Sequence, residues 1–476
     1  MRKTFVLNLG LQVALNLIVK PLYILGVDRA VQNIVGSNEY GFYAPLFNLS
    51  LILQMVNDFG IQNFISKNIS EKPENASKYF SNLLIFKCLL SFCYLILTFI
   101  IATLLGYNTA QIKLLFVLSL VQILSSFFLF FRANIAALGF FQRDSLLSVF
   151  DRLGLIILCS FLIFYQYLNS ENGIWYFATA QIFSMASACV IAYFFIKKKV
   201  TFQPVTLNFS FVKETLLASL PYASITLLMA LYTRLDSVIL ERLLPDGNLQ
   251  AGIYASAYRL LDALNALTLI FGTLLLPMFA RQIGAKESEK PLLRLSLTLV
   301  SFISISAAFL VFAYRSEIVH LMYREATNYW AELLGILILS YIPLSLMYIL
   351  GALSTAKNLL RPMQYVFGFA AFFNILLNIF LIKKYQAQGA AYTTLLTQWL
   401  VVIGLVYINR FQFDFKPIFK TLIFSILYAF SIYFLQKTNL DWRVQIIVAS
   451  FSALLWSSLL GFWDLKNVLK QKGFSK

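Results

Sequence analysis

The sequence predicts an all-α polytopic membrane protein with about 14 transmembrane helices, and three observations support this fold class. Apolar residues make up 60% of the 476 residues, charged residues make up only 12%, and the mean hydropathy is +0.76. Soluble domains are normally less than half apolar. The apolar residues also form long continuous runs, whereas a membrane β-barrel would need segments of about ten residues with alternating polarity. A closed barrel is therefore excluded, and membrane-spanning helices remain.

The individual spans follow from apolar runs of roughly 20 residues, the length that crosses a bilayer at about 1.5 Å per residue. Short polar loops separate these runs. In chain order, we expect helices near residues 5–25, 40–64, 79–104, 112–138, 146–167, 173–196, 215–240, 252–279, 292–313, 330–353, 362–382, 389–408, 417–434 and 442–462.

The first span carries a polar stripe on an otherwise apolar helix. Asn8, Gln12, Asn16 and Lys20 recur every four residues, so they share one helical face. Hydrogen bonding to neighbouring helices would explain one or two such residues. Four in register instead indicate the wall of a hydrated path. The polar interruptions and the lack of a small-residue cleavage site also predict a retained first helix, not a cleaved signal peptide.

The distribution of positive charge orients the helices. If both termini are cytoplasmic, the inner loops and tails hold 23 Lys and Arg residues and the outer loops hold nine. The positive-inside rule favours this orientation. The bias accounts for much of the net charge of +17. Because no basic recognition motif accompanies the charge, nucleic acid is not an expected partner.

Six further cations fall inside the predicted spans, where a charge near the bilayer centre costs about 2.5–3.5 kcal/mol. By depth they form an outer and an inner tier, namely Lys20, Arg234 and Arg259, and Lys87, Arg132 and Arg152. A cation near a helix end can extend to the interface or pair locally, and for Arg132 and Arg152 this alternative is equally good. The outer tier is favoured to line a cavity that handles an anion.

Acidic residues accompany both tiers. Asp236 and Asp262 lie near the outer tier, and Asp58 and Asp151 lie near the inner tier. Asp236, Asp262 or Asp58 could couple transport to an ion or proton gradient, because a carboxylate titrates when its cationic partner binds substrate. Structural pairing with a neighbouring arginine is the alternative. No GxxxxGK[ST] loop occurs, so ATP hydrolysis is not expected. With one histidine, His320, neither a metal site nor a cofactor is expected.

A short internal repeat links the two halves of the chain. The second span begins with Gly41-Phe42-Tyr43-Ala44, and the eighth begins with Gly252-Ile253-Tyr254-Ala255. Copies six spans apart have the same orientation, which is typical of a transporter with two similar lobes. We therefore predict an N-lobe with helices 1–6 at 1–200, a cytoplasmic linker at 201–214, a C-lobe with helices 7–12 at 215–410, and helices 13 and 14 with a basic cytoplasmic tail at 411–476.

Three stretches carry a family resemblance. They are Gly36-Ser37-Asn38-Glu39-Tyr40-Gly41-Phe42-Tyr43 with Asp58-Phe59-Gly60-Ile61; Arg234-x-Asp236 with Gly252-x-Tyr254-x-x-Ala257-Tyr258-Arg259-Leu260 and Pro277; and Asn374-x-x-x-Asn378 leading to Gln388-Gly389-Ala390-Ala391. In these stretches the chain resembles the polysaccharide repeat-unit flippases, which transport O-antigen, capsule and exopolysaccharide units. These flippases belong to the MOP superfamily with the MATE drug exporters and the lipid II flippases.

The resemblance implies two six-helix lobes around a central cavity, with two further C-terminal helices. It implies translocation of an undecaprenyl-diphosphate-linked oligosaccharide repeat unit across the bacterial cytoplasmic (inner) membrane by alternating access, and no enzymatic reaction. The lipid-linked oligosaccharide and membrane lipids are then the expected partners, and other polysaccharide assembly proteins are candidates.

A diphosphate would be received by cationic side chains, and arginine suits this role because its planar fork donates two parallel hydrogen bonds. We expect the inner cations to meet the diphosphate first, and Lys20, Arg234 and Arg259 to hold it near the midplane. Asn16 is a candidate for binding sugar hydroxyls. For Asn374 and Asn378, bonding between helices is the favoured interpretation.

Two other function classes remain open. A cation-coupled multidrug exporter of the same fold would favour an apolar or acidic cavity, and the excess of Lys and Arg within the spans argues against it. A membrane glycan polymerase or glycosyltransferase would need a sizeable extramembrane loop with catalytic acids or bases, whereas the polar loops of this chain are short.

Overall fold

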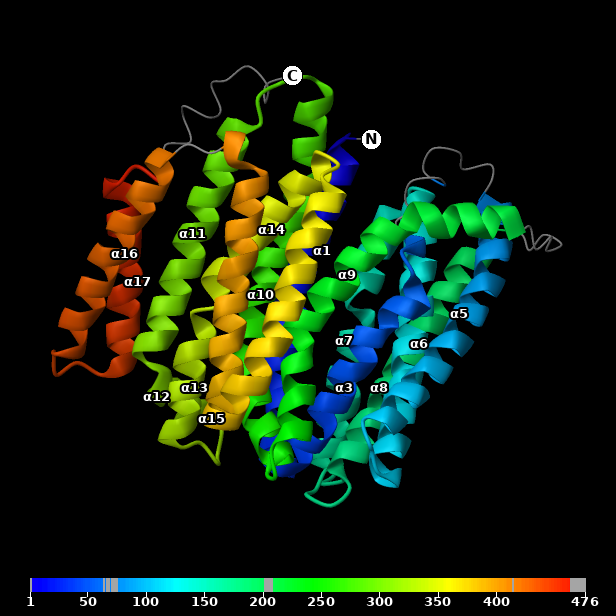
Figure 1. Ribbon diagram of the computed structural model, residues 1–476, viewed down its shortest axis with the longest axis horizontal. Coiled ribbons are helices and arrows are strands. Elements are labelled where there is room, and N and C mark those ends of the chain that lie inside the picture. The colour runs from blue at the N-terminus through cyan, green and yellow to red at the C-terminus, as the bar shows by residue number, and fades with distance from the viewer. Residues whose placement is uncertain are drawn as a thin grey trace. The chain divides into compact units, whose positions relative to one another are not determined.

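The computed structural model describes residues 2–62, 65, 69, 76–200, 209–412 and 415–462, and within these ranges it contains helices and no β-strand (Figure 1). Most of the predicted linker and the predicted basic tail, at 201–208 and 463–476, lie outside the described residues. The chain divides into two compact units. The first unit is Met1–Arg259 with Asn378–Ala387, and the second is Leu260–Leu377 with Gln388–Lys476. The predicted lobe boundaries remain a prediction.

Eleven helices among the described residues are long and apolar enough to cross a membrane. One of them, α15 (Leu360–Ile408), contains a break and corresponds to two of the predicted spans. The first two predicted spans, which carry more polar residues, form α1 (Arg2–Pro21) and α3 (Ser37–Asp58). The all-α membrane fold with about 14 spans is therefore confirmed.

The first unit contains the N-terminal helices. These are α1, the π-helix η1 (Leu22–Asp28), α2 (Arg29–Val35), α3, α5 (Ala76–Leu104), α6 (Thr109–Ala137), α7 (Phe141–Phe164), α8 (Gly173–Lys197), α9 (Phe209–Leu243) and the start of α10 (Gly247–Gly284). Helix α1 packs against α7, α3 packs against α9, and α6 packs against α8. Buried apolar side chains from α3, α6 and α8, including Leu49, Leu118 and Phe177, form one of its cores.

The first predicted helix does not end near Leu25 but continues as three connected segments to Val35. Pro21 has no N–H group and cannot maintain the regular α-helical hydrogen-bond ladder, and the π-helix η1 begins directly after it. The wider turns of a π-helix often occur at functional sites. Here η1 ends at Asp28, whose side chain is fully buried.

The two copies of the internal repeat meet in the first unit. A Cβ atom added to Gly41 would lie 1.7 Å from the carbonyl oxygen of Asn248, and one added to Gly252 would lie 1.9 Å from that of Ser37. The amide of Gln32 donates a hydrogen bond to the Gly252 carbonyl at 3.0 Å. Only glycine permits this approach, so the repeated glycines place the beginnings of α3 and α10 in direct contact.

The second unit contains the rest of α10 and the C-terminal helices. These are α11 (Lys290–Ala313), α12 (Arg315–Met322), α13 (Asn328–Ile338), α14 (Tyr341–Ala356), most of α15, the 3₁₀-helix η3 (Arg410–Gln412), α16 (Phe415–Gln436) and α17 (Trp442–Leu459). Helices α16 and α17 lie side by side and both pack on α11 (Figure 1). The Trp456 ring N–H donates to Ser431 at 2.9 Å, and buried Phe424 and Tyr428 fill the core of this group.

Breaks interrupt two of the later helical elements. The predicted spans 362–382 and 389–408 correspond to the two segments of α15, which meet at a kink at Gln386, where φ is 53° and ψ is −133°. The predicted span 330–353 is instead divided into α13 and α14 around Leu339 and Ser340. The side chain of Asn374 donates to Thr397 across the break in α15, at 3.5 Å.

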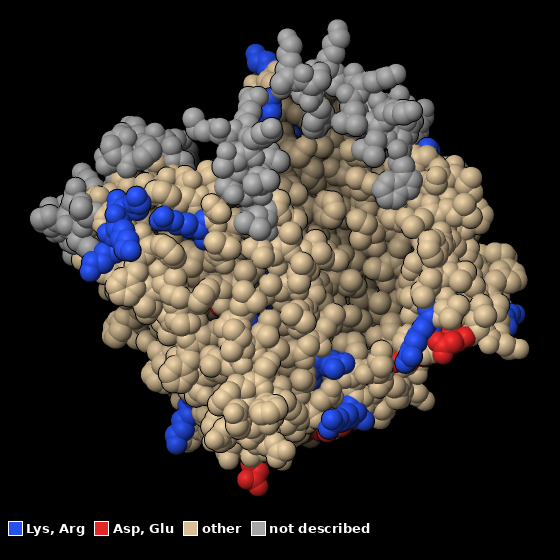
Figure 2. All heavy atoms as spheres, turned by 180° about the vertical axis from the view of Figure 1, so that it is seen from behind, with Lys and Arg blue, Asp and Glu red and all other residues tan. Residues whose placement is uncertain are grey.

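The molecular surface matches a bilayer environment. On α5, the side chains of Leu89, Phe92, Ile96 and Ile100 are exposed at helical spacing. Figure 2 shows a broad uncharged surface, with most of the visible charged side chains toward the upper and lower parts of the view. Such a contiguous apolar surface would be unfavourable in water and is expected against lipid tails. The chain is an integral membrane protein.

Candidate substrate site

A buried ion pair in the first unit joins three elements that are distant in sequence. Arg259 of α10 lies with its Nε atom 2.5 Å from a carboxylate oxygen of Asp28 in η1. The Tyr40 hydroxyl of α3 donates to the other oxygen of Asp28 at 2.9 Å. The same hydroxyl accepts hydrogen bonds from Nε and Nη2 of Arg259, at 3.0 and 2.6 Å. We call Asp28, Tyr40 and Arg259 the arginine centre.

The arginine centre is buried but not sealed. The side chain of Asp28 is 1% exposed and that of Arg259 is 17% exposed. The guanidinium also lies 5.7 Å from the centroid of the Tyr40 ring, so it interacts with the aromatic face as well as with the hydroxyl. Because Tyr40 both donates to Asp28 and accepts from Arg259, it fixes the geometry of the pair.

Three other predicted cations gather around α1 and α7. The Arg152 guanidinium lies 4.9 Å from the Tyr23 ring and 3.3 Å from the Asp151 carboxylate. Lys20 lies within electrostatic range of Arg152, Asp151 and Arg132. The structure thus associates Lys20 with predicted members of the inner tier.

These cations connect electrostatically to the arginine centre. Arg152 is close enough to interact electrostatically with Tyr23 and Asp28. Tyr23 is close enough to interact in the same way with Asp28 and Arg259. Lys20, Arg152 and Arg259 therefore belong to one connected group of charges in the first unit. Desolvating several like charges together is unfavourable unless they have anionic partners, which Asp28 and Asp151 supply here.

Arg132 and Lys87 each have a close carboxylate partner. Arg132 donates to Asp144 at 2.8 Å, and its guanidinium lies 5.6 Å from the Phe128 ring. Lys87 is completely buried, with its Nζ atom 3.3 Å from Asp58. Each of these cations is paired with a carboxylate on a neighbouring helix.

Arg234 occupies a different environment in the same unit. Its guanidinium lies 5.1 Å from the Tyr258 ring. The Tyr258 hydroxyl donates to the backbone carbonyl of Thr233 at 2.9 Å, which holds the ring in place. Tyr258 and Arg259 are adjacent on α10, so the cation–π contact of Arg234 and the arginine centre share one short helical segment.

Two predicted polar residues act between helices. Asn16 donates to Ser148 of α7 at 2.8 Å, so the polar stripe of the first helix faces α7 at this point. Asp236 is fully buried, and it accepts hydrogen bonds from the Tyr254 hydroxyl at 2.8 Å and from Asn378 at 2.7 Å. The favoured interpretation of Asn378 as a residue that bonds between helices is confirmed. Asp262, in the second unit, is partly exposed.

A family model decides the classification of the chain. The model described as "Polysaccharide biosynthesis protein" matches residues 9–282, which include every element of the arginine centre. The chain belongs to the polysaccharide biosynthesis protein family. No curated protein matches it in sequence.

Solved structures show the fold of this polysaccharide biosynthesis protein. The lipid II flippase MurJ in an inward closed conformation has a TM-score of 0.75 and 16% identity, covering 96% of this chain and 99% of that chain. An inward-facing multidrug resistance MATE transporter of the MOP superfamily has a TM-score of 0.67 and 13% identity, covering 85% and 98%. A MOP superfamily transporter from Pyrococcus furiosus has a TM-score of 0.61 and 15% identity, covering 85% and 95%. The predicted MOP-type fold is confirmed.

The sequence indicates the cations of this family member but not the partners of Arg259. Asp28 follows the first predicted span without belonging to any motif, and Tyr40 appears only as part of one. Nothing in the sequence marks Tyr23 as a site residue. Tyr40 is 219 residues from Arg259, so no local spacing connects them. The repeated Gly-x-Tyr-Ala motif is the available clue, because its two glycines bring α3 and α10 into contact.

Proposed function

We propose that this protein is a flippase that translocates an undecaprenyl-diphosphate-linked oligosaccharide repeat unit across the bacterial cytoplasmic membrane by alternating access, for surface polysaccharide biosynthesis. Membership of the polysaccharide biosynthesis family and the fold shared with the lipid II flippase support this function. The observation that carries the proposal is the arginine centre, in which a membrane-embedded Arg259 is paired with Asp28 and Tyr40.

The ion pair provides a way to bind and release a diphosphate. A diphosphate oxygen that approaches Arg259 competes with Asp28 for the same guanidinium. Arginine can hold a phosphate through two parallel hydrogen bonds, which compensates for breaking the pair with the carboxylate. Asp28 then re-forms the ion pair when the diphosphate leaves. Because Asp28 and Arg259 belong to different helices, the exchange changes the attachment between η1 and α10.

Lys20, Arg152 and Arg132 supply positive charge along the same substrate path. Lys20 and Arg152 are the better candidates for direct diphosphate contact, because Arg132 is engaged by Asp144. In this proposal Arg234 acts together with Arg259, which is supported by its contact with the Tyr258 ring next to Arg259 on α10. In this proposal Lys87 stabilises the helix packing, and Asn16 positions α1 against α7.

Asp28 is the best placed carboxylate for coupling to a proton gradient. Loss of Arg259 to the substrate would leave Asp28 as a buried carboxylate with its charge uncompensated, and protonation relieves that cost. The predicted alternative Asp236 is already held by Tyr254 and Asn378, and Asp58 is held by Lys87. Flux into vesicles at fixed membrane potential should therefore depend on the pH difference, and this dependence should disappear in Asp28→Asn.

The orientation with both termini in the cytoplasm is part of the proposal. It is supported by the excess of Lys and Arg in one set of loops. Reporter fusions after the predicted inner and outer loops would test it, and a periplasmic C-terminal reporter would contradict it.

Replacing Arg259 with Ala tests the proposed function. We expect the variant to insert in the membrane but to abolish surface glycan and to accumulate the lipid-linked intermediate. Arg443→Ala is the matched control, because Arg443 is an exposed arginine at the start of α17. Normal surface glycan from a single chromosomal copy of Arg259→Ala would contradict the assigned role.

A cation-coupled multidrug exporter is the second candidate, and the fold shared with MATE transporters favours it. The two functions differ in the charge of the cargo. An exporter of cationic drugs would be hindered by Arg259, Arg152 and Lys20. Deletion of the gene should consequently leave drug sensitivity unchanged while surface glycan is lost.

A further inference from the structure

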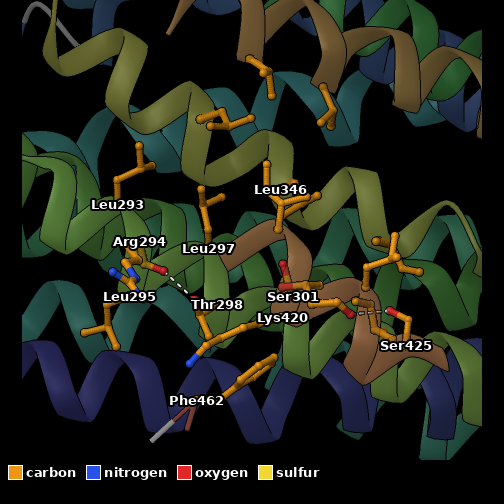
Figure 3. Close-up of a pocket in the computed structure, with 18 of the residues that line it drawn as sticks. Leu293, Arg294, Leu295, Leu297, Thr298, Ser301, Leu346, Lys420, Ser425 and Phe462 are labelled. Carbon is orange, nitrogen blue, oxygen red and sulfur yellow. Dashed lines mark hydrogen bonds between the residues drawn. The ribbon is translucent and has the colours of Figure 1, made fainter. Parts of the chain in front are cut away.

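A large cavity lies within the second unit, in a region that contributes nothing to the arginine centre. Its volume is about 920 Å³, near the upper end of the roughly 300–1,000 Å³ typical of ligand pockets. Helices α11, α14, α16 and the last part of α15 form its walls, and Phe462 after α17 closes one side (Figure 3).

The wall formed by α11 changes in polarity along the helix. Six of its ten cavity-lining residues recur every three or four positions and form one stripe: Lys290, Arg294, Thr298, Ser301, Ile305 and Phe309. The other four, at the cationic end, are Pro291, Leu293, Leu295 and Leu297. The stripe begins with two cations, continues with two hydroxyl groups and ends with two apolar side chains. At 1.5 Å per residue, Thr298 lies about 6 Å and Ser301 about 10 Å along the helix from Arg294.

Helix α16 presents a matching wall. Lys420 lies at its beginning, and its Nζ atom donates to the Leu460 carbonyl at the end of α17 at 2.9 Å. A lysine ammonium has three donors, so it can bind a further acceptor. Ser425 lines the cavity deeper along α16. In Figure 3, the side chains of Arg294, Thr298 and Lys420 lie near one another at one part of the cavity.

Most of the other lining residues are apolar, including Leu346 and Leu350 from α14 and Trp399 and Val402 from α15. Protein interiors are close-packed, and a void of this size in a bilayer would forfeit the dispersion contacts of every side chain around it. In a membrane, the acyl chains of lipids are available to fill this cavity. The three cations at one end favour an anionic phosphate over a neutral head group.

We propose that this cavity binds a glycerophospholipid of the bilayer with a net negative head group. Lys290, Arg294 and Lys420 bind the phosphate, Thr298 and Ser301 face the glycerol and ester region, and the apolar walls enclose the acyl chains. Ser301 favours a glycerophospholipid, because a polyprenyl diphosphate has no carboxylic ester to accept a hydrogen bond there, whereas the Thr298 hydroxyl already donates to the Arg294 carbonyl at 2.8 Å. The bound lipid holds α16 and α17 against α11. The proposal is independent of the flippase function.

Trp399 gives a direct optical test on the purified full-length protein in detergent. Phosphatidylglycerol with brominated acyl chains should quench tryptophan fluorescence at about tenfold lower concentration than brominated phosphatidylcholine. The same titration of Trp399→Phe identifies the part of the signal that comes from the cavity. Equal quenching by the two lipids, or quenching that persists unchanged in Trp399→Phe, would overturn the proposal.

Charge variants and a competitor complete the test. Lys290→Gln combined with Arg294→Gln should abolish the tenfold preference, whereas Lys286→Gln, an exposed lysine outside the cavity, should preserve it. Should the double variant not fold, Arg294→Gln alone should reduce the preference. Unlabelled phosphatidylglycerol should displace the brominated lipid more effectively than undecaprenyl phosphate does. The reverse order would assign the cavity to the polyprenyl carrier and refute a phospholipid site.

Discussion

Two of the cation–carboxylate pairs in the first unit differ in which partner is exposed: Asp58 is 21% exposed beside Lys87, whereas Asp28 is 1% exposed beside Arg259. Lys87 has no exposed side-chain surface, and it is enclosed by Asp58, the Asn57 carbonyl at 3.4 Å and the rings of Phe127 and Phe130. Arg259 keeps 17% of its side-chain surface exposed. It is also held by a tyrosine hydroxyl and belongs to a larger group of charges.

The comparison distinguishes an ion pair that stabilises helix packing from one whose arginine can exchange its carboxylate partner for another anion. A sealed cation cannot change partner without opening the helix packing, because an unpaired charge in a dry environment is very unfavourable. A partly exposed arginine can accept a new anion while the old partner remains nearby. In sequence both residues are simply cations within apolar spans, so burial and partner geometry distinguish them.

The largest effect is expected from removing the carboxylate partner of Lys87, the fully buried cation. Asp58→Ala leaves the Lys87 ammonium buried without its carboxylate, which should cost about 3–5 kcal/mol of folding free energy. Asp58→Leu combined with Lys87→Met should recover most of this loss, because both charges are removed together. Thermal unfolding in detergent measures both variants. An Asp58→Ala protein as stable as the parent would mean that Lys87 is not a sealed structural cation.

A second variant disturbs the arginine centre without removing a charge. Gly41→Ala places a methyl group against the Asn248 carbonyl, and overpacking of this kind costs roughly 1–3 kcal/mol. The adjacent Tyr40 must shift with the helix, so flipping should fall even though Arg259 and Asp28 are intact. Gly284→Ala is the control, because an added Cβ atom meets nothing within 4 Å there. Wild-type flipping by Gly41→Ala would show that the centre tolerates displacement.

Much of the fold was predictable because the length of an apolar run can be read from the local sequence alone. The predicted span 173–196 corresponds to α8, and 292–313 corresponds to α11, with ends within two residues. The extension through η1 was not predicted, because a π-helix depends on how the chain continues after Pro21 and carries no apolar periodicity of its own. The predicted spans 362–382 and 389–408 correspond to the two segments of α15, which meet at the kink at Gln386.

The candidate site was predictable only in part. Arg259 stood out because an arginine within an apolar span is costly, a cost that is visible in one segment of sequence. Its partners come from η1 and α3, and their proximity depends on tertiary packing around the paired glycines. The same limit explains why Lys20 was grouped by depth with Arg234, whereas its electrostatic neighbours in the structure are Arg152, Asp151 and Arg132.

Replacing arginine with lysine in one pair, and lysine with arginine in the other, tests the distinction between the two pairs. Arg259→Lys keeps the charge but loses the planar fork, so we expect flipping to decrease about tenfold, equivalent to roughly 1.4 kcal/mol. Lys87→Arg should reduce stability while leaving flipping per folded molecule unchanged. Lipid-linked substrate translocation in proteoliposomes measures the first effect. Full activity of Arg259→Lys would reduce the requirement at this position to positive charge alone.

The smallest effect is expected from an ion pair outside the membrane spans, between Glu289 and Lys357, which lie 2.5 Å apart. Burial opposes ionisation of Glu289, but the hydrogen bond from Lys357 and the charges of Lys357 and Lys290 lower its pKa below the ordinary glutamate value. The pair therefore adds stability above about pH 4.3 and loses it as the pH falls further. Glu289→Gln should cost about 0.2–1 kcal/mol at pH 7 and nearly nothing at pH 3, measured by thermal unfolding against exposed Glu287→Gln. A free-energy cost of Glu289→Gln that increased toward low pH would contradict the predicted direction of the pH dependence.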